Sequence, residues 1–89
     1  MATEYQLKLT VLSREYCHLC ENMIAALREL QAQRGYFNLE IVDVDRDAAL
    51  EERYGERVPV LLLDGVEVCH YRFDPEALNA RLMAATRQA

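Results

Sequence analysis

Two cysteines separated by two residues form the part of this sequence best suited to chemistry. Cys17-His18-Leu19-Cys20 falls where an apolar segment gives way to a helical pattern. A thiolate is the nucleophile in thiol–disulfide exchange, and the free N–H groups and positive dipole end of a helix N-terminus favour that charged form. Because Cys20 shares an apolar helical stripe with Met23, we expect a buried Cys20 beside an exposed Cys17, as such exchange requires.

Two basic side chains flank Cys17 in the sequence. Arg14 precedes it, and His18 follows it directly. Either side chain can add positive potential around a thiolate, and an imidazole beside a thiol can modulate the pKa of that thiol. Simple exposure is the alternative for His18.

The same cysteines could instead begin a zinc site. Cys17, Cys20, Cys69 and His70 supply suitable ligand types. However, Cys69 and His70 are adjacent in an expected strand, so their side chains should point to opposite faces and cannot share one tetrahedron. We therefore favour redox chemistry and expect no metal site, with Cys69 as a small apolar strand residue.

Hydrophobic periodicity and turn residues predict the elements that position the cysteines. Asp64-Gly65 is a strong hairpin signal, and Asp74-Pro75 combines an N-cap with proline at the first helical position. The expected strands are residues 5–12, 38–44, 60–63 and 66–71. The expected helices run from Cys17 to a stop at Gly35, from a cap at Asp45 or Asp47 to Gly55, and from Pro75 onward.

The predicted order is β-α-β-α-β-β-α. A parallel opening unit with a right-handed crossover, followed by an antiparallel hairpin and a closing helix, gives an α/β fold. We expect a four-stranded mixed sheet with helices on both faces, formed by residues 1–89 as a single domain.

Charge and composition exclude several classes of protein. The net charge of −5 argues against a nucleic-acid partner, because the clustered basic residues of such proteins are missing. No apolar run reaches the length of a membrane span, and the N-terminus lacks the pattern of a secretory signal. Three cysteines are too few and too odd in number for a disulfide framework. We expect a cytoplasmic monomer.

Taken together, these features resemble the small bacterial glutaredoxin-like proteins of the thioredoxin-fold superfamily. The likeness covers about residues 6–87 and rests on Cys-His-Leu-Cys at the first helix, on Val58-Pro59 before the third strand, and on the hairpin and helix that end the chain. It implies that Cys17 is the nucleophile and Cys20 the resolving cysteine.

The resemblance also implies roles in substrate binding. Arg14 stands where glutaredoxins often carry a lysine near the thiolate. The backbone of Val58 would pair with a bound thiol substrate, held in place by a cis Pro59.

Departures from the family pattern bear on the reductant. His18-Leu19 replaces the frequent Pro-Tyr, and the Gly-Gly pair before the last helix is missing. Asp74 would occupy helix N–H groups and repel a carboxylate, which leaves Arg72 as the local compensation. We expect no bound cofactor and weak glutathione binding. Glutathione or a protein thiol could still serve as the reductant.

The sequence therefore predicts a thiol–disulfide oxidoreductase acting on protein or low-molecular-weight thiols and disulfides. One alternative is a thioredoxin-fold adaptor whose cysteine pair is regulatory or vestigial. Another is a metal-handling protein that uses the same two cysteines.

Overall fold

The fold is built on a mixed sheet of four strands in the order β2-β1-β3-β4. The computed structural model describes residues 7–34 and 37–87. β1 pairs in parallel with β2 and antiparallel with β3, which pairs antiparallel with β4. The strands are β1 (Leu7–Ser13), β2 (Phe37–Asp43), β3 (Val60–Leu63) and β4 (Val66–His70). The helices are α1 (His18–Arg34), the 3-10 turn η1 (Val44–Arg46), α2 (Ala48–Tyr54) and α3 (Pro75–Arg87).

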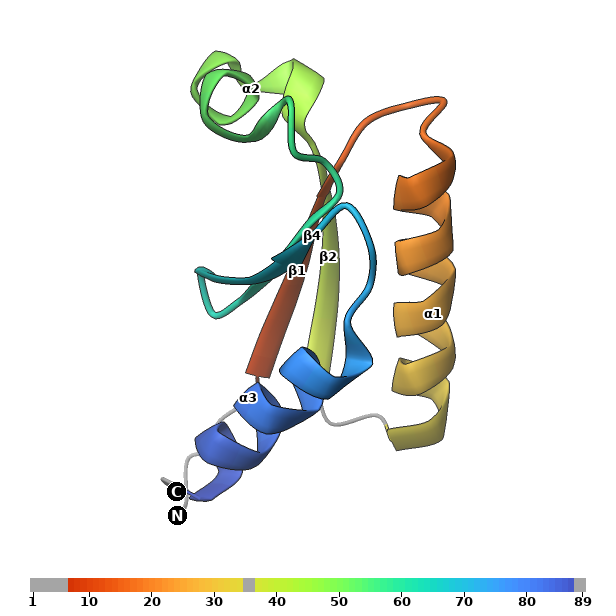
Figure 1. The fold of residues 1–89 in the computed structure, drawn as a ribbon, viewed down its shortest axis with the longest axis vertical. Helices are drawn as coiled ribbons and strands as arrows, with labels where there is room; N and C mark the ends of the chain where they lie inside the picture. The colour runs from red at the N-terminus through yellow and green to blue at the C-terminus, as the bar shows by residue number, and fades with distance from the viewer. Residues whose placement is uncertain (1–6, 35–36, 88–89) are drawn as a thin grey trace.

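Helices cover both faces of the sheet, which confirms the predicted α/β architecture (Figure 1). α1 and α3 pack on one face, where Met23, Leu27 and Leu78 meet Leu9 and Leu61. α2 packs on the other face, where Tyr54 joins a smaller cluster around Leu12, Val44 and Val60. The central strands β1 and β3 are therefore buried from both sides, as their apolar runs predict.

The β3–β4 hairpin turns as the Asp-Gly signal predicts. Asp64 and Gly65 both have positive φ, 49° and 88°, as a tight hairpin turn of this kind requires. A bulge follows in β4, since Leu61 pairs with Cys69 and Leu62 with Glu67. The bulge bends the strand, and both Val68 and Cys69 pack against the larger core cluster.

Several predicted boundaries are wrong by a residue or two. Val44 belongs to η1 rather than β2, because Asp43 accepts a hydrogen bond from the Asp45 N–H and turns the chain there. Tyr71 leaves β4 because its φ is 67°. β1 extends to Ser13. The predicted start of the first strand at residues 5–6 and the helix stop at Gly35 lie outside the described residues. Within the described ranges, no helix is long and apolar enough to cross a membrane.

Candidate functional site

Cys17 and Cys20 form a disulfide at the N-terminus of α1. Their Cα atoms are 5.2 Å apart, within the usual range for a bridged pair. Cys17 is half-buried, whereas Cys20 is only 1% exposed and packs under the first turn of the helix. The predicted burial of Cys20 is confirmed, whereas Cys17 is less exposed than predicted.

Cys17 also occupies the N-cap position of α1. Its carbonyl accepts a hydrogen bond from Glu21 N–H at 3.0 Å, and its Sγ accepts one from Cys20 N–H at 3.2 Å. Serine, threonine or aspartate usually supplies the side-chain acceptor at this position. Here a sulfur does so, and the same N–H is placed to stabilise that sulfur as an anion once the disulfide is reduced.

Tyr16 immediately precedes the pair and was not predicted as a site residue. Its backbone is left-handed, with φ of 60°, and its side chain is 97% exposed. This conformation costs a bulky residue about 1–2 kcal/mol. The connector between β1 and α1 has no glycine or asparagine, the residues that adopt a left-handed backbone most easily. That absence is the sequence signal that could have revealed a strained turn. The turn displays an aromatic ring beside the redox pair.

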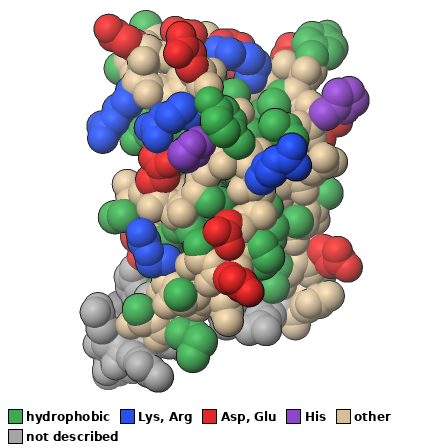
Figure 2. Space-filling model, viewed as in Figure 1, with side chains coloured by type: hydrophobic (Ala, Val, Ile, Leu, Met, Phe, Trp, Pro, Cys, Tyr) green, Lys and Arg blue, Asp and Glu red, His purple; other side chains and the backbone are tan. Residues whose placement is uncertain are grey.

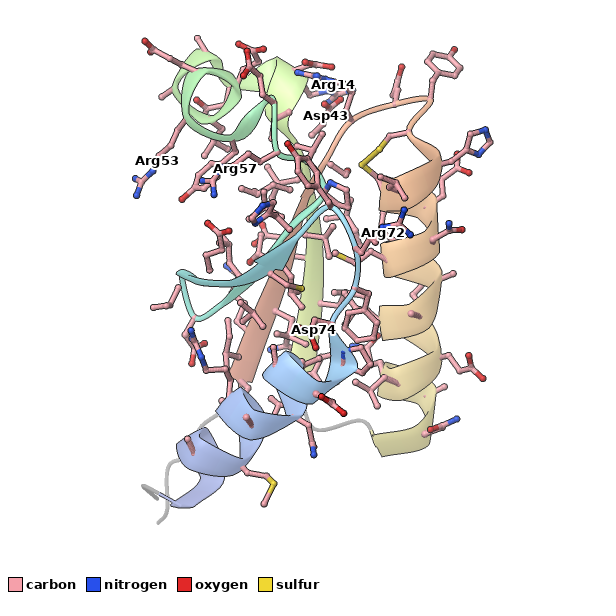
Figure 3. All side chains as sticks on the ribbon, in the orientation of Figure 1. Arg14, Asp43, Arg53, Arg57, Arg72 and Asp74 are labelled. Carbon is pink, nitrogen blue, oxygen red and sulfur yellow. A yellow bond between two sulfur atoms is a disulfide. The ribbon has the colours of Figure 1, made fainter. Side chains whose placement is uncertain are left out.

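The Val58–Pro59 peptide bond is cis, as the resemblance implies. Because Leu12 pairs with Val60, the start of β3 and the end of β1 lie at the same end of the sheet. Val60 also pairs with His70, which brings the end of β4 to the same end of the sheet. The cis proline and the end of β4 therefore lie at the same end of the sheet as the end of β1, and Figure 3 shows the disulfide at the start of α1, just beyond β1.

The segment after β4 is fastened to the proline by Tyr71. The Tyr71 N–H donates to the Pro59 carbonyl at 2.8 Å, and the Tyr71 hydroxyl donates to the Glu56 carbonyl at 2.9 Å. Arg72 follows, and its exposed side chain extends toward α1 in Figure 3. Among the described residues, its guanidinium has no ion-pair partner, so its charge is open to a ligand. The predicted substrate-binding roles of Val58, Pro59 and Arg72 remain predictions.

Arg14 is engaged by acidic residues near α2. Its Nε lies 3.1 Å from both carboxylate oxygens of Asp45, and its Nη2 lies 3.3 Å from Glu51 Oε2. Its Nη1 donates to the Gly55 carbonyl at 3.2 Å. The hydrogen bond to Asp45 raises the pKa of Arg14 further above its ordinary value, against an opposing effect of burial. The contacts direct the guanidinium toward η1 and α2, and a role beside the thiolate remains a prediction.

His18 projects into solvent beside Cys17. Its side chain is 97% exposed, and Nδ1 lies 3.8 Å from Glu21 Oε1. An imidazole this exposed acts on the neighbouring sulfur through water, which screens the effect.

Cys69 and His70 diverge as expected for adjacent strand residues. Cys69 packs against the larger core cluster, where burial raises the pKa of its thiol. His70 instead lies 2.9 Å from Glu67 Oε2, and that carboxylate also accepts from Arg57 at 3.0 Å. Across residues 7–34 and 37–87, no three His, Cys, Asp or Glu side chains are placed to hold a metal ion.

Comparison with known proteins identifies relatives over nearly the whole chain. The model of the glutaredoxin-like domain family matches residues 8–83. An uncharacterized protein of Mycobacterium tuberculosis is 32% identical over 84 residues, which are 89% of this chain and 86% of the relative.

Solved structures agree with this match. A protein of Nitrosomonas europaea, solved by NMR, is 41% identical with a TM-score of 0.77, and the match covers 91% of this chain and 96% of that one. A protein of X. campestris is 44% identical with a TM-score of 0.65, over 85% and 96% of the two chains. Fasciola hepatica thioredoxin, at 19% identity and a TM-score of 0.64 over 89% and 80%, shares the fold.

Proposed function

Because the chain belongs to the glutaredoxin-like domain family, we propose that it is a thiol–disulfide oxidoreductase working by dithiol exchange through Cys17 and Cys20. The observation that carries this proposal is the Cys20 N–H aimed at the accessible Cys17 Sγ, with Cys20 itself buried. A cysteine pair retained only for stability would gain nothing from leaving one sulfur accessible at a helix N-terminus.

The reaction, written in the direction of substrate reduction, has two displacements. The Cys17 thiolate attacks one sulfur of the substrate disulfide, forms a mixed disulfide and expels the other sulfur as a thiolate. Cys20 then loses its proton and attacks the Cys17 sulfur, which closes the internal disulfide and releases the second substrate thiolate. Two electrons pass from the protein to the substrate. The reverse sequence oxidises a dithiol.

The first displacement should start from a thiolate that the helix stabilises. The Cys20 N–H and the positive end of the α1 dipole both stabilise the Cys17 thiolate, so Cys17 should ionise more readily than a free thiol. Burial of Cys20 opposes ionisation of its thiol, which favours Cys17 as the sulfur that attacks first. The burial of Cys20 therefore sets the order of the two displacements, with Cys17 reacting before Cys20.

Substrate would lie along the surface formed by Val58, Tyr16 and Arg72, while the buried Pro59 would act only by fixing the backbone of Val58. An extended segment beside the mixed disulfide could pair with the backbone of Val58, while the exposed Tyr16 ring offers apolar contact. The unpaired Arg72 charge would attract a carboxylate of the substrate.

A protein thiol suits this surface better than glutathione as the reductant. Asp74 already accepts the Ala77 N–H at 3.1 Å, so it caps α3 and places negative charge where a glutathione carboxylate would bind. We propose a cytoplasmic monomer with no bound cofactor, acting on protein or small thiols and disulfides, with glutathione as a weak alternative reductant. Nucleic acid and membranes are not expected partners.

Single cysteine variants test the proposal. Cys17→Ser should reduce a model disulfide no faster than a protein-free control. Cys20→Ser should accumulate a mixed disulfide visible by mass spectrometry, because no second thiol resolves it. Cys69→Ser is the matched control and should retain the wild-type rate.

Two outcomes would favour the alternatives. If neither Cys17→Ser nor Cys20→Ser changes the rate, the pair is not catalytic and an adaptor role gains support. If native mass spectrometry finds zinc on the reduced protein, the metal-handling alternative gains support.

A further inference from the structure

A solvent-accessible groove between α1 and α3 lies apart from the cysteine pair. It encloses about 520 Å³. Its apolar lining comes from Ala26, Leu30, Phe73, Leu78 and Leu82. Leu78 and Leu82 form its buried floor, whereas Leu30 and Phe73 are only half-buried and leave apolar surface available.

The walls of this groove carry unpaired negative charge. Glu29 lines it from α1 and Glu76 from α3, so two carboxylates stand on opposite sides of an apolar floor. Neither glutamate makes an ion pair with another residue in the described parts of the chain. Gln33 and Asn79 add hydrogen-bonding amides to the same rim. Figure 2 shows hydrophobic side chains exposed between acidic ones over these two helices.

We propose that this α1–α3 groove docks an amphipathic helix of a partner protein, with lysine or arginine flanking its apolar face. Apolar anchors at helical spacing would fill the floor beside Leu30 and Phe73. The flanking cations would meet Glu29 and Glu76, which matches a pattern of basic residues on both sides of an apolar stripe.

A second copy of this chain fits the groove poorly. A two-fold interface brings the same surface patch of the two copies together. Glu29 and Glu76 would then face the same two carboxylates of the copy, and the chain's net charge of −5 would add to the repulsion. A basic partner meets no such penalty.

Docking in the groove leaves the redox site open. Ala26, the lining residue of α1 nearest to the cysteine pair, lies six residues beyond Cys20, which is about 9 Å along the helix axis. The partner could therefore stay bound while Cys17 exchanges disulfides, and the groove could hold a protein whose disulfide or thiol is elsewhere on its surface. The docking itself does not depend on the proposed redox activity.

Peptide binding measured by fluorescence anisotropy, together with amide NMR mapping on the full chain, tests the proposal. The probe is a synthetic helix with leucines at i, i+3, i+4 and i+7 flanked by lysines, compared with the same peptide carrying glutamate in place of lysine. The lysine peptide should bind at least tenfold more tightly, and its amide shifts should map to Leu30, Phe73 and Leu78.

Variants separate the groove from general attraction to an acidic protein. Glu29→Gln with Glu76→Gln should weaken binding about tenfold at low salt, on the order of threefold for each exposed charge. Glu52→Gln with Glu56→Gln removes the same charge from exposed positions elsewhere and should have much less effect. Ala26→Trp should block the floor without changing charge. Reduction of the Cys17–Cys20 disulfide should proceed at the wild-type rate in all of them.

Four results would overturn the docking proposal. They are equal weakening by the two glutamate pairs, equal binding of both peptides, amide shifts centred on Tyr16 and Cys17, and self-association of the free protein through the groove. None of these results contradicts the proposed cysteine chemistry.

Discussion

Arg14 and Asp45 form an ion pair that ties the segment before Cys17 to the turn after β2. The Nη2 atom lies 3.0 Å from Asp45 Oδ1, and Nε lies 3.1 Å from each carboxylate oxygen. The same guanidinium donates to the Gly55 carbonyl at the end of α2. Arg14 thus joins three segments at the end of the sheet that carries the disulfide.

This contact predicts that the main role of Arg14 is to stabilise the fold. Arg14→Met should lower the midpoint of thermal unfolding by more than Lys8→Met, whose ion pair with Glu40 at 2.9 Å is more exposed. The unfolding midpoint of Arg14→Lys should lie between those of Arg14→Met and the wild-type protein, because an ammonium keeps the charge but cannot reproduce the planar fork. An Arg14→Lys variant as stable as the wild-type protein would show that only the charge matters, whereas equal midpoints for the Met and Lys variants would show that the planar hydrogen-bonding fork matters.

A second prediction concerns the thiolate. In the reduced protein, the pKa of Cys17 should lie below the value of about 8.5 for a free thiol, because the Cys20 N–H and the helix dipole favour the anion. His18→Phe should leave the titration of thiolate absorbance nearly unchanged, since the imidazole is 97% exposed. A clear rise in the Cys17 pKa in that variant would instead make His18 a contributor.

The helix caps were predictable from sequence because capping is local. Asp74 was recognised from its position before a helical pattern, and Asp47 was one of two candidates with Asp45; Asp47 and Asp74 both accept hydrogen bonds from backbone N–H groups. The alternating strands and the Asp64-Gly65 turn could be predicted equally well, since each depends on residues that are neighbours in the chain.

Long-range contacts could not be predicted in the same way. The partners of Arg14 are 31 to 41 residues away, and several acidic residues were equally plausible. The bulge in β4 lets both Val68 and Cys69 pack against the larger core cluster, and no pattern in residues 66–71 records it. The α1–α3 groove is a property of two helices together. Sequence therefore located the cysteine chemistry but not its surroundings.

The caps also give a prediction about stability. Asp47→Ala and Asp74→Ala should each lower the free energy of unfolding by about 1 kcal/mol, because helix N–H groups lose their acceptor. The loss should be larger for Asp47, which accepts from both Ala49 and Leu50. Serine at either position should recover most of it. Urea denaturation measures these differences, and an unaffected Asp47→Ala variant would contradict the capping role.

Cys69 predicts a dependence of stability on alkaline pH. Burial raises the pKa of its thiol above the ordinary value of 9.0. Below pH 9.0 the folded and unfolded chains both hold the proton. Above it, the unfolded chain loses the proton first, so stability falls as pH rises toward the folded-state pKa.

The measurement is the difference in unfolding free energy between the wild-type protein and Cys69→Ala as a function of pH. Subtracting the variant removes the contribution of the tyrosines and of Lys8, which titrate in the same range. The advantage of the wild-type protein should shrink above pH 9.0. A difference that stays flat to higher pH would mean that the Cys69 thiol ionises equally in both states.

The last prediction concerns the reductant and depends on Asp74 and Arg72. Oxidised protein should be reduced faster by a thioredoxin-type protein than by glutathione at matched concentration. Asp74→Ser keeps a cap on α3 but removes the charge that repels a carboxylate, so it should raise kcat/KM for glutathione about two- to fivefold. Arg72→Ala should lower it by a similar factor, because an unpaired cation is lost. Asp47→Ser and Arg28→Ala are the matched controls and should leave both reductants unaffected. If glutathione is clearly the faster reductant of the wild-type protein and Arg72→Ala abolishes that advantage, this surface is a working glutathione site.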